Sequence, residues 1–118
     1  MNLEFTKEDN DFRLEVREFI KNNLPKEISA KIADGKRISK EDIVTWQKIL
    51  FKKGWGAPAW PKEYGGTGWS TVEQYIFEEE SADACAPIQL PFGLKMVAPV
   101  MMAFANQAQK EKFLPRII

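Results

Sequence analysis

The sequence predicts an all-α fold: a helical bundle of about five to six helices, interrupted by one long ordered connection rich in Gly, Pro and Trp. Apolar residues recur at helical spacing in several segments, and residues typical of helix caps stand at the ends of those segments. Almost no segment alternates apolar and polar residues as a strand does. The 118 residues, 44% of them hydrophobic and 29% charged, suit one compact domain.

A first helix is predicted between Thr6 and Leu24. Thr6 precedes a charged first turn, and Phe5 before it is placed to form a hydrophobic staple with that turn. The Leu24-Pro25 pair ends the helix, because a proline restricts the residue before it to extended backbone. The apolar face consists of Phe12, Val16, Phe19 and Ile20.

Residues 26–36 are either a short helix or a loop ending near Gly35, since their apolar periodicity is weak. Ser39 caps the next helix, and Gly54 follows its basic last turn as a C-terminal cap. The apolar face of this helix consists of Ile43, Trp46, Ile49 and Leu50.

The connection GWGAPAWPKEYGGTG, residues 54–68, holds five of the seven glycines and two of the seven prolines. Connections this long are usually ordered by their own side chains or functional. We expect its aromatic side chains to pack onto the helices, and a ligand-stacking platform is the alternative. These side chains are Trp55, Trp60, Tyr64 and Trp69.

Three further helices are predicted beyond this connection. Ser70 and Glu73 form a capping box, and the acidic residues 78–80 with Asp83 are expected to face mostly outward as a solvated surface rather than a metal site. A helix starting near Met96 or Val97 would place Pro99 in its first turn, where a missing N–H has the smallest effect. Asn106 with Gln109 caps the last helix, whose apolar side consists of Phe113, Leu114, Ile117 and Ile118.

Composition excludes several classes of function. Lys and Arg total 17, as do Asp and Glu, so there is no basic excess for a nucleic acid. The absence of histidine removes Ser-His-Asp sites and histidine-ligated metals, which leaves carboxylates as bases and predicts no metal site. Cys85 has no partner for a disulfide and no basic neighbour, so we interpret it as a small filler. With no signal peptide and no membrane span, a cytoplasmic location is expected.

The most pocket-like part of the sequence is apolar and partly irregular, and it includes an adaptable Met side chain. Ordinary core is the alternative reading for this segment. Its candidate pocket residues are Leu90, Pro91, Phe92, Gly93, Leu94 and Met96.

Four segments give the chain a resemblance to the N-terminal helical domain of acyl-CoA dehydrogenases over essentially its whole length. They are FTKEDNDFRLEVREFIKNNLP, WQKILFKKGWGAPAWPKEYGG, EEESADA and QAQKEKFLPRI. The stretches WPKEYGGTGWS, YIFEEE and LPFGLKMVAPV are most similar to the branch that includes pimeloyl-CoA dehydrogenase large subunits. Two positions depart from the family pattern: Ala105-Asn106 replaces Gly-Thr, and Ala108 replaces an acidic residue. Asn still caps a helix, so the expected fold is unaffected.

The resemblance implies a FAD-dependent α,β-dehydrogenation of an acyl-CoA to a trans-2-enoyl-CoA, with electrons passing to an electron-transfer flavoprotein. It also implies that the catalytic glutamate and most of the flavin site belong to a middle β-domain and a C-terminal helical domain, both absent from residues 1–118. No catalytic and no FAD-binding residue is therefore assigned here. The resemblance also implies that the N-terminal helices help wall the inner end of the acyl pocket, and by position this points to the candidate pocket residues between Leu90 and Met96.

Two hypotheses follow for the 118 residues. In the first, they are the first domain of a longer flavoenzyme, inactive alone, and the unusual Ile117-Ile118 ending is a truncated boundary. In the second, they form a stand-alone helical interaction module that docks on a partner subunit through its apolar end and Trp-rich loop. Either way a homo- or hetero-oligomer is expected, with self-association through the region from Phe104 to Ile118.

Overall fold

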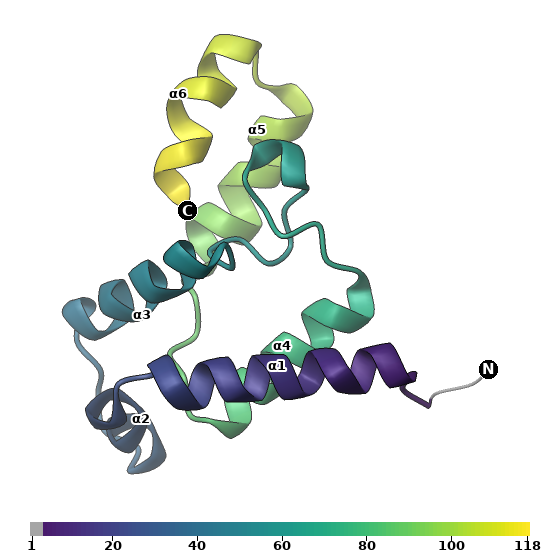
Figure 1. The fold of residues 1–118 in the computed structure, drawn as a ribbon. Helices are drawn as coiled ribbons and strands as arrows, with labels where there is room; N and C mark the ends of the chain where they lie inside the picture. Colours follow the sequence, from purple (N-terminus) through teal and green to yellow (C-terminus); the bar gives the residue numbers. More distant parts are fainter. Residues whose placement is uncertain (1–3) are drawn as a thin grey trace. The chain divides into compact units, whose positions relative to one another are not determined.

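The computed structural model describes residues 4–118, and within them every regular element is helical (Figure 1). This confirms the predicted all-α class. Six α-helices are joined by turns, by a short 3₁₀ helix, η1, and by a wider π-helical segment, η2. In chain order the elements are α1 (Lys7–Asn23), α2 (Lys26–Ala33), α3 (Lys40–Lys53), η1 (Lys62–Tyr64), α4 (Thr71–Asp83), η2 (Phe92–Val97), α5 (Ala98–Phe104) and α6 (Gln107–Ile117).

The chain divides into two compact units, and each is described by itself. Unit 1 contains the described residues up to Trp46 together with Ser70–Ile88, and unit 2 contains Gln47–Trp69 and Gln89–Ile118. Helix α3 contributes its first half to unit 1 and its second half to unit 2.

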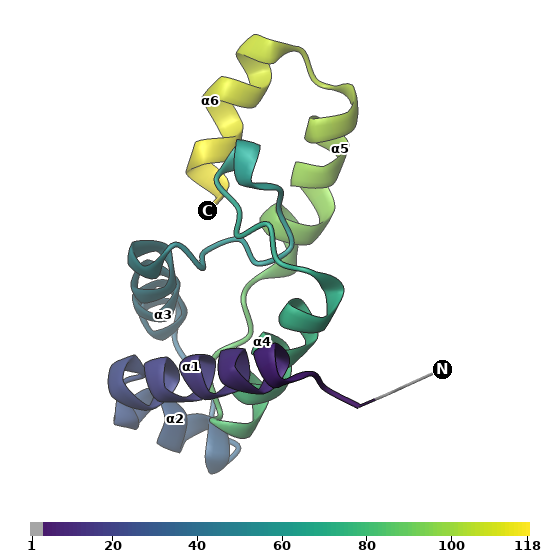
Figure 2. The ribbon, with the colours of Figure 1, turned by 45° about the vertical axis from the view of Figure 1, so that its right-hand side comes forward.

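In unit 1, helices α1 and α4 pack along each other, as both ribbon views show (Figures 1 and 2). The apolar positions predicted for α1 explain this contact, because Val16 and Ile20 are buried on one helical face. The ring of Phe19 lies 6.4 Å from that of Trp46. The other buried apolar side chains of this unit are Ile28, Ile76, Phe77 and Ala86.

In unit 2, α5 packs against both η2 and α6. A compact apolar core joins these helices to the 54–69 connection, and partly buried side chains from Tyr64, Met101 and Met102 pack around it. The buried members of this core are Ala57, Trp60, Leu94, Ala98 and Leu114.

Local cap signals predicted the helix starts correctly. The side chains of Thr6, Ser39, Ser70 and Asn106 each accept the backbone N–H three residues onward, at 2.9–3.2 Å. The uncertain stretch 26–36 contains a true helix, α2, followed by Gly35 at a φ of 67°.

One local prediction was wrong. Phe5 does not pack on the first turn, where the facing position is polar, but stacks on Tyr75 of α4 with ring centroids 6.4 Å apart. The helix predicted to start near Met96 or Val97 is confirmed, because α5 begins at Ala98 and has Pro99 in its first turn. The π-helical segment η2, which precedes it from Phe92, was not predicted. Among residues 4–118, no helix is both long and apolar enough to cross a membrane.

Candidate functional site

The predicted pocket segment lies on η2 and the turn before it. Phe92 and Met96 are 67% and 58% exposed, and Leu90 is 54% exposed, whereas Leu94 is only 8% exposed. The segment therefore has one anchored side and one side that presents carbon-rich side chains outward. This division is what a wall for an apolar ligand requires.

The exposed side chains of the segment continue along α5. Phe92, Met96, Val100 and Phe104 follow one another at intervals of four residues, and Phe104 is 86% exposed. We call this set of exposed apolar side chains along η2 and α5 the 92–104 ridge. Exposed apolar surface of this extent marks a place where a ligand or another polypeptide binds.

The Trp-rich connection is a packed structure of its own. Trp60 and Trp55 are 3% and 7% exposed, and the ring of Trp69 meets that of Trp55 edge-on with centroids 5.3 Å apart. The prediction that these aromatics pack down is confirmed. Trp55 and Trp60 are therefore unavailable to a ligand, and the half-buried rings of Tyr64 and Trp69 are the only ones of the four on which the alternative of a stacking platform could rest.

Two hydrogen bonds and one glycine fold this connection back on itself. The Thr67 hydroxyl donates to the Pro58 carbonyl at 2.7 Å, and the Gly68 N–H donates to the Trp60 carbonyl at 3.1 Å. A Cβ on Gly66 would lie 2.1 Å from that same carbonyl oxygen, closer than any two such atoms can approach. Only glycine therefore allows the close backbone crossing that places Trp60.

A long-range contact joins this connection to the pocket segment. The indole N–H of Trp60 donates to the carbonyl of Leu94 at 2.8 Å, across 34 residues of sequence, in a buried position. No signal in the sequence pointed to this bond, because neither helical periodicity nor cap rules pair residues so far apart.

The last two isoleucines pack inside unit 2. A Cβ on Gly93 would lie 2.7 Å from Ile117 Cγ2, and one on Gly56 would lie 2.5 Å from Ile118 Cγ2. At both positions the absence of a Cβ leaves the space that an isoleucine side chain occupies. Ile117 and Ile118 are both partly buried and pack against the core of this unit.

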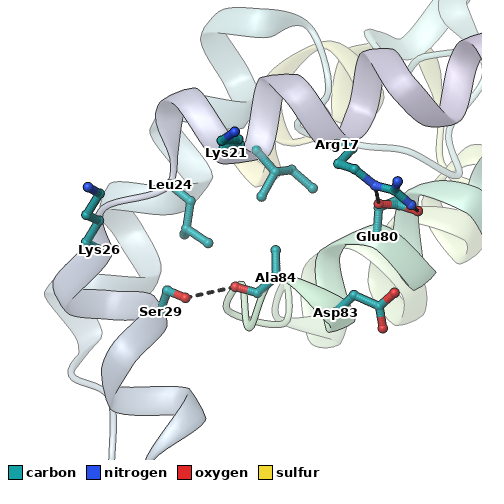
Figure 3. Close-up of a pocket in the computed structure, with 9 residues that line it drawn as sticks. Arg17, Lys21, Leu24, Lys26, Ser29, Glu80, Asp83 and Ala84 are labelled. Carbon is teal, nitrogen blue, oxygen red and sulfur yellow. Dashed lines mark hydrogen bonds and ion pairs between the residues drawn. The ribbon is translucent and has the colours of Figure 1, made fainter.

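A separate pocket of about 430 Å³ lies within unit 1, between α1, the start of α2 and the end of α4 (Figure 3). Leu24 points into it, and Ile20 and Ala84 are its other apolar lining residues (Figure 3). Ser29 closes one end by donating its hydroxyl to the Ala84 carbonyl at 2.9 Å. The charged lining residues are Arg17, Lys21, Lys26, Glu80 and Asp83.

Glu80 corrects the expectation that residues 78–80 with Asp83 form a mostly outward, solvated surface. Its side chain is 4% exposed and accepts two hydrogen bonds from Arg17, at 2.8 and 2.9 Å, and one from Arg13 at 2.9 Å. Arg13 also pairs with Glu79. A buried carboxylate is tolerated when opposite charges and hydrogen bonds compensate its desolvation, and two guanidinium groups do so here.

The electrostatics of this cluster fix both carboxylates in the charged form. The Arg17 guanidinium, helped by Arg13, holds the pKa of Glu80 below its ordinary value despite burial. Arg13, and then the Tyr75 hydroxyl, lower the pKa of Glu79. A paired carboxylate of lowered pKa is a poor proton acceptor. The cluster is therefore structural, and it joins α1 to α4 inside unit 1.

No group of three or more Asp, Glu or Cys side chains that could hold a metal ion occurs within residues 4–118. Cys85 is half-buried and adopts a left-handed backbone with a φ of 55°. Its N–H and that of Ala86 close the end of α4 on the carbonyls of Ala82 and Ser81. This is the hydrogen-bond pattern of a Schellman cap, in which glycine usually stands at the left-handed position.

Comparisons with known proteins define the class to which this helical fold belongs. The profile of the family described as "Acyl-CoA dehydrogenase, N-terminal domain" matches residues 6–118. Acyl-CoA dehydrogenase IpdE1 of Mycobacterium tuberculosis is 35% identical over 112 residues, which cover 91% of this chain and 29% of that protein.

Two solved structures are similar along nearly the whole chain. One is the ChsE4-ChsE5 complex from Mycobacterium tuberculosis, with a TM-score of 0.78 and 34% identity over 99% of this chain and 29% of that one. The other is described as the Tcur3481-Tcur3483 steroid ACAD, with a TM-score of 0.80 and 30% identity over 99% and 30% of the respective chains.

The chain belongs to the acyl-CoA dehydrogenase family and corresponds to its N-terminal domain. This confirms the resemblance seen in the sequence. The chain spans less than a third of the length of these relatives. The pimeloyl-CoA branch stays a prediction.

Proposed function

We propose that residues 1–118 are the N-terminal helical domain of a FAD-dependent acyl-CoA dehydrogenase and supply one wall of its acyl pocket. The observation that carries the proposal is the two-sided segment on η2: Leu94 is buried, whereas Leu90, Phe92 and Met96 present apolar side chains outward. Membership of the family supports an acyl chain as what these side chains contact. The proposed wall comprises Leu90, Pro91, Phe92, Gly93, Leu94 and Met96.

The reaction proposed for the whole protein removes one hydrogen from the α carbon and one from the β carbon of an acyl-CoA thioester, giving a trans-2-enoyl-CoA. FAD would accept the electrons, and an electron-transfer flavoprotein would receive them next. The described residues do not fit a flavin. The η2 segment offers carbon surface with Lys95 as its one charged side chain, and the charged pocket of unit 1 is lined by ion-paired groups. We therefore assign no catalytic or FAD-binding residue to this chain.

The role of this chain is to bind and orient the acyl portion and to exclude water from it. Burying apolar surface contributes about 25 cal/mol per Å², so a wall of several exposed apolar side chains can hold an acyl chain without any polar contact. Middle and C-terminal domains beyond residue 118 would supply the base and the cofactor site. On this proposal the isolated chain is inactive.

The substrate class within acyl-CoA thioesters is open to two candidates. One similar structure is described as a steroid acyl-CoA dehydrogenase, which favours a bulky ring-bearing acyl group. The resemblance to the pimeloyl-CoA branch favours a chain with a carboxylate at its far end. At positions 90–96 the chain exposes three large apolar side chains, Leu90, Phe92 and Met96, and one cation, Lys95.

We propose a hetero-oligomer as the native assembly. Both similar structures carry the names of two proteins, and one is described as a complex. The 92–104 ridge supports self-association of the isolated chain, because no part of residues 4–118 covers Phe104. Within the region predicted for this contact, 104–118, Phe104 and Phe113 are exposed, whereas Leu114 is buried and both terminal isoleucines are partly buried against the core. Sedimentation should show association above micromolar concentration, and a monomer throughout would contradict it.

The second candidate function, a stand-alone module that docks on a partner subunit, is favoured by the same ridge. Its other proposed contact surfaces are weaker, since Trp55 and Trp60 are buried in the connection and Ile117 and Ile118 pack on the core. The two candidates differ in the coding sequence after Ile118. An open frame continuing into β-rich sequence would eliminate the module, and a stop codon would eliminate the larger enzyme.

Flavin content and turnover test the main proposal. The natural-length protein should be yellow and reduce an electron-accepting dye when given an acyl-CoA, whereas residues 1–118 alone should bind no FAD and reduce nothing. Stoichiometric flavin on the 118-residue chain would overturn the assignment of the cofactor site to other domains. A natural-length protein that is yellow yet inert toward every acyl-CoA would overturn the reaction.

A further inference from the structure

In the pocket segment, the residue that would donate to the Leu94 carbonyl in the five-residue register is a proline. In η2 the bonding pattern spans five residues, as the Ala98 N–H donating to the Gly93 carbonyl shows. The next bond in this register would run from position 99 to the Leu94 carbonyl, and Pro99 has no N–H. The wide turn therefore stops at the proline, leaving the Leu94 carbonyl without that donor.

A buried carbonyl without a partner destabilises the conformation that contains it. The indole N–H of Trp60 supplies the missing donor at 2.8 Å. Trp60 is itself fixed, because it is 3% exposed and the Gly66 crossing leaves its backbone no room to shift. The donor thus comes from a rigid part of the 54–69 connection.

The opposite side of the turn is fixed by sterics. Gly93 lies so close to Ile117 that a Cβ would come within 2.7 Å of that side chain. Leu94 is buried in the core between these two anchors, and the adjacent positions Phe92 and Met96 remain exposed. Their direction follows from the wide turn, because converting it to an ordinary α-helical turn would rotate them around the helix axis.

We propose that Trp60 is a positioning residue for the acyl pocket. By holding the Leu94 carbonyl it maintains the π-helical form of η2, and through that form it sets where Phe92 and Met96 meet the acyl chain. Trp60 itself contacts no substrate in this account. The inference rests on the proposed function, which identifies the outward side of η2 as an acyl wall.

Pro99 allows the proposed hydrogen bond to be removed at one position and replaced from another. Trp60→Phe keeps a buried ring but removes the N–H, so the Leu94 carbonyl loses its donor. Adding Pro99→Ala returns an N–H to position 99, which the five-residue register aims at that same carbonyl. The second substitution should therefore repair the first. Trp69→Phe is the matched control, since it makes the same ring change in the same connection, where Trp69 packs edge-on against Trp55.

The natural-length protein carrying each variant is measured in two ways: amide hydrogen exchange of the peptide spanning 92–104, and kcat/KM for a short and a long acyl-CoA. For Trp60→Phe we expect exchange in this peptide to rise at least tenfold. We expect the long-to-short ratio of kcat/KM to change on the order of tenfold, mainly through KM. Trp60→Phe/Pro99→Ala should return both readouts most of the way to wild type, and Trp69→Phe should leave both unchanged.

Additive damage in the double variant, or unchanged exchange in Trp60→Phe, would overturn the role of Trp60 in holding the turn. Raised exchange with an unchanged long-to-short ratio would overturn its role in positioning the acyl wall. A wild-type protein that dehydrogenates no acyl-CoA would overturn the proposed function instead. In that case the exchange measurements alone still decide whether Trp60 maintains the wide turn.

Discussion

The interior of unit 1 and the interior of unit 2 are stabilised by different kinds of interaction. In unit 1 a buried ion-pair cluster, centred on Glu80 and the two arginines of α1, adds to the apolar packing between α1 and α4. In unit 2 the apolar core is accompanied by close contacts at two glycines and by long-range hydrogen bonds from the Trp60 indole and the Gln89 amide. Charge therefore contributes to the helix pair of unit 1, whereas close packing and hydrogen bonds from uncharged side chains position the part of unit 2 that carries the proposed pocket wall.

The largest effect on stability is expected from a substitution at the close backbone crossing in unit 2. Gly66→Ala would place a Cβ 2.1 Å from the Trp60 carbonyl oxygen, a backbone atom that cannot move aside cheaply. We expect a loss of about 3 kcal/mol in the free energy of unfolding, measured by urea titration and followed by tryptophan fluorescence. Gly35→Ala is the control, because a Cβ there meets nothing within 4 Å, although its positive φ imposes a smaller penalty.

Neutralising the central carboxylate of the ion-pair cluster in unit 1 should have the next largest effect on stability. Glu80→Gln keeps the shape of the side chain but removes the charge that pairs with Arg13 and Arg17. We expect a loss of roughly 2 kcal/mol in the free energy of unfolding, because two guanidinium groups lose a charged acceptor. Thermal unfolding followed by circular dichroism measures it, with Glu18→Gln on the exposed surface of α1 as control. Equal stability of the two variants would mean that the cluster contributes nothing.

The charged cluster also predicts how stability depends on pH. Because Arg17 and Arg13 lower the pKa of Glu80 and Glu79 in the folded protein, the unfolded chain binds protons first as pH falls. The stabilisation is present above the ordinary carboxylate pKa of about 4.3 and is lost as pH falls through the lowered values. Unfolding measured from pH 6 to pH 3 should show a shallower slope in Glu80→Gln than in wild type. Identical slopes would contradict the assignment.

A cap in unit 1 should contribute less than the cluster. The Ser70 hydroxyl accepts a hydrogen bond from the Glu73 N–H at 3.2 Å, and the Glu73 carboxylate accepts one from the Ser70 N–H at 2.8 Å. Ser70→Ala should cost about 1 kcal/mol in the free energy of unfolding, since one donor at the start of α4 loses its partner. Ser70→Asp, which can cap equally well, should restore stability. If it does not, another feature of the site explains the loss.

The smallest predicted change is a gain. Cys85 adopts a left-handed backbone that glycine adopts without strain. Cys85→Gly should raise the free energy of unfolding by about 0.5 kcal/mol, the relief of strain being partly offset by the greater freedom of glycine in the unfolded chain. Cys85→Ala tests the cause, because it retains the Cβ and should show no such gain.

The features that could be predicted from the sequence are local. Thr6, Ser70 and Asn106 start helices through bonds to residues three positions away, so a short window of sequence contains the whole signal.

The features that escaped prediction depend on distant partners. Glu80 is buried because arginines 63 and 67 positions earlier meet it, and nothing in its neighbours distinguishes it from Glu78. The wide turn at η2 depends on a tryptophan 34 residues away. Phe5 stacks on an aromatic side chain of α4 rather than packing on the first turn of α1.

The central claim is that the outward side of η2 contacts the acyl chain, and photoaffinity labelling tests it most directly. An acyl-CoA carrying a diazirine on its acyl chain is bound to the natural-length protein and irradiated, and the labelled peptides are identified by mass spectrometry. We expect label on the segment from Leu90 to Met96, displaced by an excess of unmodified acyl-CoA. Displaceable label confined to other segments, with none on Phe92 or Met96, would contradict it.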